Sequence, residues 1–322
     1  HAILGLEGHV GTLDHNADGA ITVAFSNFAG AGIGRDVMGF FDYRDMLPSS
    51  DSEATGNEMD ILWSRTPGAS NPRVQAVATL AHEYAHLASF AVRVSGQGTS
   101  ATQEALWLDE GIAHLMEDLL GWGPSNINVV EEALANWGDT ALAGPVDGIA
   151  NRGMAYLFLR HLVDTKAKLS GVTSADDAEV VAAAAAVIRP LMTSSASGFE
   201  HPSLAGMSGT EHAQWLLGVF ATGGSFLDAA HRADFLSPGT ASTGYTTGID
   251  PRGMFENAEG QSVPLDGPST DDFDDLESVY EGEVLESGSL FLMLTDLEPG
   301  SHTIRGNADE GTYLQMHVEQ VE

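Results

Sequence analysis

Two histidines and a glutamate stand close together at His82, Glu83 and His86, in the pattern His-Glu-x-x-His. In a helix, the four-residue spacing puts His82 and His86 on one face, one turn apart, so that both imidazoles can bind the same metal ion. Glu83 then lies near enough to act on a water molecule at that metal. Two histidine ligands and a glutamate base are typical of hydrolytic zinc sites. The alternative is a plain surface helix that carries these residues by chance.

A hydrolytic zinc site uses three protein ligands and keeps one position open, so a third ligand is expected elsewhere in the chain. Glu110, in a second helical stretch, is the leading candidate. Asp109 is the rival carboxylate, but its neighbouring position should point it away from the metal, towards a supporting role. His114, one turn after Glu110, is a weaker rival.

The residues with this chemistry fall in stretches that should be helical. Small apolar residues at three- and four-residue steps predict a long helix from Pro72 to about Val94. A second helix is expected over 102–120. The first helix is rich in alanine and otherwise apolar, so we expect it to be buried, where its histidines and glutamate need polar partners such as a metal ion. Weaker helical patterns cover 129–137, 154–169, 175–188 and 211–221.

Short strands are expected on both sides of the helical part of the chain. Three precede it, at 20–25, 37–41 and 59–63, and a polar surface loop is expected from Leu47 to Gly56. We hypothesise that 59–63 is an edge strand that pairs with an extended peptide. Further strand-like runs lie at 284–285, 289–294, 302–304 and 313–318.

These patterns predict an α+β fold with two parts. Residues 1–248 would form a domain with a twisted N-terminal sheet, a metal-binding helix and a mostly helical second half. The composition changes near residue 248, where strand-like runs replace helical ones and acidic residues far outnumber basic ones. We therefore expect 249–322 to form a small acidic module resembling a β-sandwich.

The two metal motifs, His82–His86 and Trp107–Gly111, resemble those of the Glu-ligated zincins. Their surroundings are most similar to the hyicolysin-type family of secreted bacterial zinc metallopeptidases. Softer similarities are found at Asp14–Gly19, Gly39–Asp42, Asn57–Met59 and Gly153–Leu159. The resemblance covers about residues 10–170, and Asp109 stands where such motifs more often have asparagine.

The resemblance implies a zincin-like metalloprotease domain in which His82, His86 and Glu110 bind Zn²⁺. Glu83 would be the general base: it takes a proton from a zinc-activated water and passes it to the leaving amine. Glu117 lies two turns after Glu110, and Glu-ligated aminopeptidases have a carboxylate at that spacing, so Glu117 is a candidate support for a ligand histidine. A solvated helix residue is the alternative for Glu117.

Related enzymes often use a tyrosine or histidine to stabilise the tetrahedral oxyanion beside the metal. Tyr156 is the candidate for this catalytic role, and packing in the core with Phe158 and Leu159 is the alternative. Three histidines, which the sequence does not rank, could take the same role: His161, His201 and His212.

Asp14, Asn16 and Asp18, followed by Gly19, match the first half of a calcium-binding loop. The bidentate glutamate expected at the twelfth position is replaced by Phe25. A Ca²⁺ site completed by other residues is one hypothesis, and an ordinary Asp/Asn/Gly turn without an ion is the other.

The overall composition limits the function classes. The 322 residues carry a formal net charge of −33, which disfavours nucleic acids and anionic membrane surfaces as partners. The apolar runs are too short for a membrane span, and the absence of cysteine excludes thiolate ligands and a cysteine nucleophile. The strong acidity and the start at His1 favour a mature, secreted bacterial protein, which we expect to be a monomer.

The leading interpretation is a secreted zinc-dependent metalloendopeptidase that acts on peptide or protein substrates. A zinc aminopeptidase is the alternative within enzymes. The alternative of another class is a non-catalytic surface binding or adhesion protein with a structural zinc. A base at Glu83 argues against it, and so does a set of only three ligands, because structural zinc sites usually have four protein ligands.

Overall fold

The computed structural model describes residues 3–4, 16–27, 37–68, 73–97, 103–143, 148–169, 177–205, 215, 249, 251, 254–257, 260–273 and 292–294. These residues form a mixed α+β structure. A small mixed sheet lies at the N-terminal end, a mostly helical region follows it, and short strand pairs occur near the C-terminus.

The N-terminal sheet contains β1 (Thr22–Ser26), β2 (Gly39–Phe41) and β3 (Ile61–Arg65) in the order β1-β3-β2. β3 pairs parallel to β1 and antiparallel to β2, with Phe40 opposite Trp63. The prediction that 59–63 forms an edge strand is therefore wrong. β3 is central, with neighbours on both sides, and strand order depends on tertiary packing that local patterns do not encode.

β2 packs directly against α2 (Arg73–Gln97), and Gly39 makes this approach feasible. A Cβ atom at position 39 would lie 2.5 Å from Thr79 Cγ2 and 2.7 Å from the Trp63 carbonyl oxygen. The same Cβ would lie 3.4 Å from Glu83 Cγ. A side chain at position 39 would force the strand off the helix, so glycine is what brings β2 beside Glu83.

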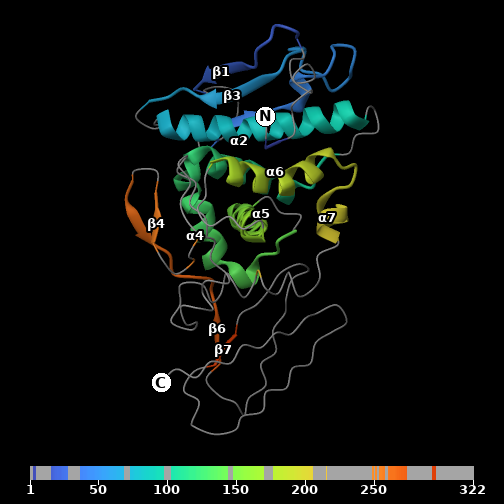
Figure 1. The fold of residues 1–322 in the computed structure, drawn as a ribbon. Coiled ribbons are helices and arrows are strands. Elements are labelled where there is room, and N and C mark those ends of the chain that lie inside the picture. The colour runs from blue at the N-terminus through green and yellow to red at the C-terminus, as the bar shows by residue number, and fades with distance from the viewer. Residues whose placement is uncertain are drawn as a thin grey trace, which may run out of the picture.

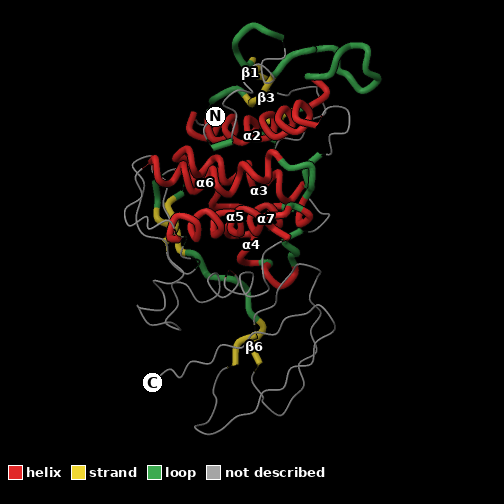
Figure 2. The backbone as a smooth tube through the Cα atoms, turned by 45° about the vertical axis from the view of Figure 1, so that its right-hand side comes forward, coloured by secondary structure: helices red, strands yellow, loops and turns green. Residues whose placement is uncertain are grey.

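α2 forms a layer of its own between the sheet and the remaining helices (Figures 1 and 2). The predicted helix from Pro72 to about Val94 is confirmed. The sheet covers one side of α2, while α3 (Leu106–Glu117) and α6 (Asp177–Thr193) cover the other. Because both sides are covered, small residues such as Ala78, Ala85 and Ala88 are fully or almost fully buried.

Two glycines allow α5 (Ile149–Leu169) to pack closely on its neighbours. At Gly111 of α3, a Cβ would lie 2.9 Å from Ala155 Cβ. At Gly153 of α5, a Cβ would lie 1.9 Å from the Val129 carbonyl oxygen in α4 (Ile127–Ala135). α5 is therefore in near backbone contact with both α3 and α4.

The remaining helical elements among the described residues are short. They are η1 (Tyr43–Asp45), η3 (Asp118–Trp122), η4 (Gly123–Asn126), η5 (Trp137–Asp139), η6 (Gly198–Glu200) and α7 (Pro202–Ala205). The second predicted helix, 102–120, stops near its expected end because Gly121 adopts a φ of 86°, which takes the backbone off the helical path. The helix expected at 211–221 lies outside the described residues except for Trp215.

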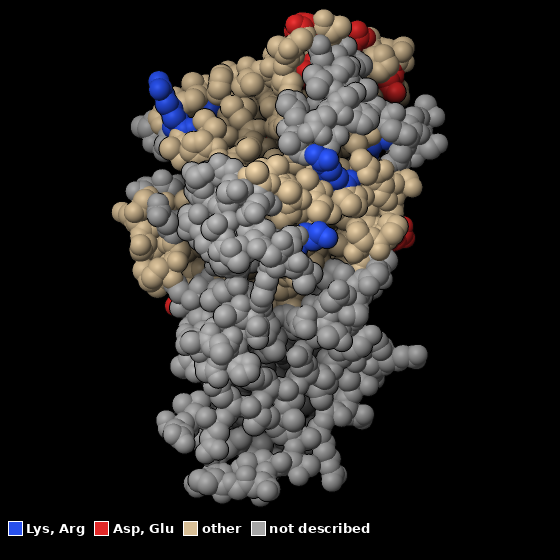
Figure 3. Space-filling view, viewed as in Figure 1, with Lys and Arg blue, Asp and Glu red and all other residues tan. Residues whose placement is uncertain are grey.

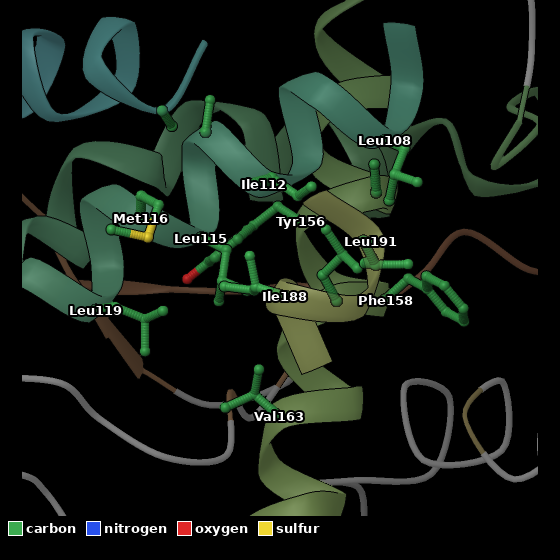
Figure 4. Close-up of a cluster of buried hydrophobic side chains, with 14 of the residues drawn as sticks. Leu108, Ile112, Leu115, Met116, Leu119, Tyr156, Phe158, Val163, Ile188 and Leu191 are labelled. Atoms are coloured by element: carbon green, nitrogen blue, oxygen red, sulfur yellow. The ribbon is translucent and has the colours of Figure 1, made fainter. Parts of the chain in front are cut away.

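The main hydrophobic core lies among α3, α5 and α6 (Figure 4). Ile112, Leu115, Tyr156, Phe158 and Ile188 are almost completely excluded from solvent. These side chains fix α3 and α5 relative to each other, and both helices carry residues discussed below.

The C-terminal strands form two small pairs. β4 (Met254–Glu256) pairs antiparallel with β5 (Ser262–Pro264), and β6 (Asp271–Phe273) pairs parallel with β7 (Leu292–Leu294). β7 falls within the predicted strand 289–294. The runs at 284–285, 302–304 and 313–318 lie outside the described residues.

Part of this C-terminal region contacts the helices. The Ser269 N–H donates to the Leu134 carbonyl at 2.8 Å, the Trp137 N–H donates to Ser269 Oγ at 3.1 Å, and Leu265 is buried in the main core. A division at residue 248 stays a prediction.

No helix in the described part of the chain has the length and apolar character needed to cross a bilayer. On the face shown in Figure 3, acidic side chains gather at the end formed by the N-terminal sheet and the loop between β2 and β3. Residues 48–53 of that loop are exposed, so the predicted surface loop is confirmed.

Candidate metal centre

The packing of α2 against α3 brings His82, His86 and Glu110 together. One ligand atom from each residue lies within 4.8 Å of the others. His82 Nε2 is 3.3 Å from Glu110 Oε2, and His86 Nε2 is 3.9 Å from Glu110 Oε1. The three side chains are only 10–13 % exposed. They form a compact, nearly buried group with the composition of a metal site.

The opposite side of each imidazole is held by a carboxylate. His82 Nδ1 lies 2.8 Å from Glu117 Oε1, and His86 Nδ1 lies 2.7 Å from Asp109 Oδ2. An ionised carboxylate can only accept a hydrogen bond, so each Nδ1 carries the proton and donates it. In the neutral rings, each Nε2 then has a lone pair for a metal ion. Carboxylate support of this kind fixes the tautomer and orientation of ligand histidines.

The ligand atoms of His82, His86 and Glu110 are better accommodated with a cation between them than without one. His82 Nε2 and Glu110 Oε2 are both acceptors when His82 is neutral, yet they face each other at 3.3 Å. Glu110 Oε2 is buried, and Arg152 Nη1 lies 3.0 Å from it. A metal ion between these atoms would be bound by all three side chains, and the buried carboxylate would favour its positive charge. Two imidazoles and a carboxylate are ligands that suit Zn²⁺.

The electrostatics of the group favour positive charge. Burial lowers the pKa of His82, but the contacts with Glu110 and Glu117 outweigh burial and raise it well above its usual value. Burial raises the pKa of Glu110, but His82, His86 and Arg152 outweigh it and lower that pKa to about 2. The same carboxylates that favour a proton on His82 would favour a metal cation in its place.

Glu83 lies between the metal group and β2. Its carboxylate is buried and accepts a hydrogen bond from the Phe41 N–H. Burial raises the pKa of Glu83, and the nearby His82 and His86 lower it to a smaller extent. A carboxylate with a raised pKa next to a metal group is suited to taking up and releasing a proton.

Arg152, in the first turn of α5, is a member of the site that sequence reasoning missed. Its Nη1 lies 3.0 Å from Glu110 Oε2, and its side chain is 30 % exposed. No motif pointed to this residue, although it directly precedes the glycine that opens the segment Gly153–Leu159. Only the packing of α5 on α3 reveals the contact.

Glu117 belongs to a larger hydrogen-bonded network. His114 Nδ1 lies 3.1 Å from Glu117 Oε1 and 2.8 Å from Asn126 Oδ1, and the Ser125 hydroxyl donates to Glu117 Oε2. Geometrically, His82, His114 and Glu117 could also hold a metal ion. Nδ1 of His82 and Nδ1 of His114 lie at hydrogen-bond distances from Glu117 Oε1, whereas His114 Nε2 is buried and has no hydrogen-bond partner among the described residues. His114, the weaker rival ligand, thus contacts the supporting glutamate.

Tyr156 is not turned towards the metal group. Its hydroxyl donates to Asp118 Oδ2 at 2.7 Å, and Arg160 Nη1 donates to the Tyr156 oxygen at 3.1 Å. The side chain is fully buried and lies among the core residues labelled in Figure 4. The structure therefore places Tyr156 in the core, as the alternative interpretation expected, and gives the proposed oxyanion role no geometric support.

The other candidate oxyanion donors have different surroundings. His201 is fully buried, and its Nε2 lies 2.7 Å from Glu104 Oε2, which also accepts from Arg93 Nη1 at 2.8 Å. His161 lies on α5, 3.4 Å from the Thr165 hydroxyl. His212 lies outside the described residues.

The segment around Asn16 and Asp18 forms a tight exposed turn. Asn16 Nδ2 donates to Asp18 Oδ2 at 3.0 Å, and Asp18 Oδ1 accepts from the Ala20 N–H at 2.9 Å. Such contacts are typical of Asx turns. Asp14 lies outside the described residues, so calcium binding stays a prediction.

Comparison with known proteins gives no family assignment: no protein-family model matches the chain, and no curated protein matches it.

Proposed function

We propose that this protein is a zinc-dependent metalloendopeptidase with a zincin-like catalytic domain. One observation carries the proposal. Two helices bring His82, His86 and Glu110 together, with carboxylates holding the far side of both imidazoles and a separate buried carboxylate, Glu83, beside them. Structural zinc sites are usually closed by four protein ligands, whereas three ligands and a nearby base are typical of hydrolytic sites.

A zinc ion bound here would act as a Lewis acid that lowers the pKa of water and polarises a carbonyl group. Glu83 accepts the proton from the attacking water and donates it to the amine that leaves. The raised pKa of Glu83 suits both halves of this transfer. Asp109 and Glu117 hold the ligand imidazoles in the required orientation.

β2 replaces 59–63 as the strand along which an extended substrate would lie. It is the strand that packs beside Glu83, through Gly39 and the Phe41 N–H. A peptide alongside β2 would place its backbone next to the base.

The net charge of −33 supports our further proposals of a secreted protein with an acidic module at 249–322.

The proposal is tested with a set of quenched peptides and purified protein loaded with one equivalent of zinc. Wild-type protein should cleave peptides whose two ends are blocked, and 1,10-phenanthroline should abolish cleavage. Glu83→Gln should keep its zinc but lose at least about a thousandfold in kcat, whereas the exposed Glu131→Gln should match wild type.

Other outcomes would replace the proposal. Cleavage only of peptides with a free amino terminus would identify an aminopeptidase. Tightly bound zinc without cleavage of any peptide would favour the binding-protein interpretation. Full activity in Glu83→Gln would contradict the assigned base.

A further inference from the structure

Both carboxylate oxygens of Glu117 are held by side chains that are not among the proposed metal ligands. His114 Nδ1 lies 3.1 Å from Glu117 Oε1, and the Ser125 hydroxyl donates to Glu117 Oε2. His82 Nδ1 contacts the same Oε1 at 2.8 Å. A carboxylate with donors on both oxygens cannot turn about its last bond without losing one of these contacts. His114 and Ser125 therefore fix the oxygen that faces the candidate ligand His82.

His114 is itself held in one orientation by Asn126. The Asn126 Nδ2 donates to the His114 carbonyl at 3.0 Å, and the amide oxygen lies 2.8 Å from His114 Nδ1. Because the two groups that face Nδ1, Asn126 Oδ1 and Glu117 Oε1, are both acceptors, Nδ1 is the ring nitrogen that carries the proton. Asn126 and His114 are both buried. The ring of His114 is thus fixed as a donor towards Glu117.

Packing alone does not explain a histidine at position 114. The residue is 8 % exposed, and within the described part of the chain its Nε2 has no hydrogen-bond partner. A buried nitrogen without a partner lowers stability, whereas phenylalanine would fill much the same space without that loss. The His114 ring also lies edge-on to the His82 ring, with 4.6 Å between the centroids. What histidine adds at this position is the Nδ1 donor towards Glu117.

A turn after α3 brings the remaining contacts into place. Gly121 adopts a φ of 86°, which takes the backbone off the helical path, and η4 then packs against the end of α3. Ser125 and Asn126 are the last two residues of η4, and they reach Glu117 and His114 respectively. The Ser125 hydroxyl also lies 2.7 Å from the Trp122 carbonyl oxygen, within the turn.

We propose that His114 and Ser125 are positioning residues of the metal centre, which hold Glu117 against His82 and so raise the zinc affinity of a site to which they contribute no ligand. This inference rests on the zinc site of the proposed function, but it does not require that the site cleave peptides. Loss of a group that supports a ligand histidine typically weakens metal binding about 10- to 100-fold. His114 and Ser125 act one contact further from the metal, so we expect their loss to have a smaller effect.

The competing role for His114 is to fill space between α3 and η4. His114→Phe keeps a ring of similar size but removes the donor. His114→Asn leaves part of the space empty but keeps an N–H donor near the position of Nδ1. A space-filling role makes phenylalanine the milder substitution, whereas a positioning role makes asparagine the milder one.

The experiment measures the zinc affinity of metal-free protein by competition with a chelating dye, with circular dichroism to check that each variant is folded. Zinc affinity should fall about 5- to 20-fold in His114→Phe and in Ser125→Ala, and less than about threefold in His114→Asn. In a Glu117→Met background, where no carboxylate remains to be held, adding either His114→Phe or Ser125→Ala should change the affinity less than about twofold. Tyr156→Phe is the control, because it loses a buried hydrogen bond of the core and should bind zinc as the wild type does.

Wild-type affinity in both His114→Phe and Ser125→Ala would overturn the proposal. Weaker binding by His114→Asn than by His114→Phe would also overturn it, as would a loss of affinity that persists in full in the Glu117→Met background. Where His114→Phe does not fold, Ser125→Ala and its double variant with Glu117→Met provide the same test. A wild type that binds zinc and shows these losses but cleaves no peptide would refute the peptidase function alone.

Discussion

Glu117 Oε1 lies 2.8 Å from His82 Nδ1 across the interface between α2 and α3. The glutamate is buried, and burial raises its pKa, but contacts with His114 and His82 outweigh burial and lower it to about 2. It is therefore ionised and accepts the His82 proton, which leaves Nε2 of that ring for a metal. The geometry of the candidate metal centre depends on this contact.

Replacing Glu117 by glutamine should weaken zinc binding without removing a ligand. The amide oxygen accepts less strongly than a carboxylate, so the His82 ring is held less well and becomes a poorer ligand. We expect zinc affinity to fall about 10- to 100-fold. Competition with a chelating dye measures it, and Glu131→Gln on the exposed face of α4 is the control. Unchanged affinity would show that Glu117 does not support the metal group.

Gly153→Ala should destabilise the helical region. The added Cβ would fall 1.9 Å from the Val129 carbonyl oxygen, which is backbone and cannot rotate away. We expect the free energy of unfolding to drop by about 3 kcal/mol, as for other overpacked sites. Urea denaturation measures the drop. Gly68→Ala, whose Cβ would meet no atom within 4 Å, is the control, and equal stability of the two variants would contradict the packing of α5 on α4.

Tyr156→Phe distinguishes a core role from a catalytic one. The substitution removes the hydroxyl that donates to Asp118 but keeps the ring that fills the core. Loss of this buried hydrogen bond should cost about 1–2 kcal/mol of stability, while kcat changes less than about twofold. A large fall in kcat with unchanged stability would restore the oxyanion role that the sequence suggested.

His161 should make the stability of the protein depend on pH. Burial lowers its pKa to about 4, so between about pH 6.5 and pH 4 the unfolded chain binds a proton that the folded protein does not. The contribution of His161 to stability is therefore present above pH 6.5 and is lost as the pH falls towards 4. When the pH falls from 7 to 5, the free energy of unfolding of the wild type should drop by about 2 kcal/mol more than that of His161→Gln.

Urea denaturation of metal-free protein, with a chelator present at both pH values, measures this difference without a contribution from zinc release. Parallel losses of stability in the wild type and His161→Gln would show that His161 titrates alike in the folded and unfolded states.

The grouping of His82, His86 and Glu110 was predictable because it follows from local rules. A four-residue spacing places two side chains on one face of a helix wherever that helix lies. Glycine and proline then mark where one helix ends, so a second helix can return alongside the first. Once the second helix packs alongside the first, Glu110 comes close to both histidines.

The supporting contacts and the orientation of Tyr156 depend on how the helices dock. Asp109 could be predicted to point away from the metal, but its contact with His86 depends on the angle between α2 and α3. Tyr156 lies on a helix whose sequence is apolar on several faces, so its pattern did not show that the hydroxyl meets Asp118. Arg152 meets Glu110 only through close packing at two glycines, which no spacing rule encodes.

The order of the sheet was also beyond local patterns. Each of the three N-terminal strands was predicted within a few residues, yet 59–63 was assigned to an edge and β3 is central. Strand patterns report which residues are extended, whereas strand order is set by how the sheet packs on α2. The weak strands β4, β5 and β6 have only three residues each and gave no periodic signal.

The most direct test of the proposed metal centre is a zinc titration of metal-free protein, followed by competition with a chelating dye. We expect one tightly bound zinc per chain in the wild type and in Glu83→Gln. In Glu110→Gln we expect zinc affinity at least about 100-fold weaker, with an unchanged circular dichroism spectrum. Failure of the wild type to bind zinc, or equal affinity in Glu110→Gln, would contradict a metal centre built from His82, His86 and Glu110.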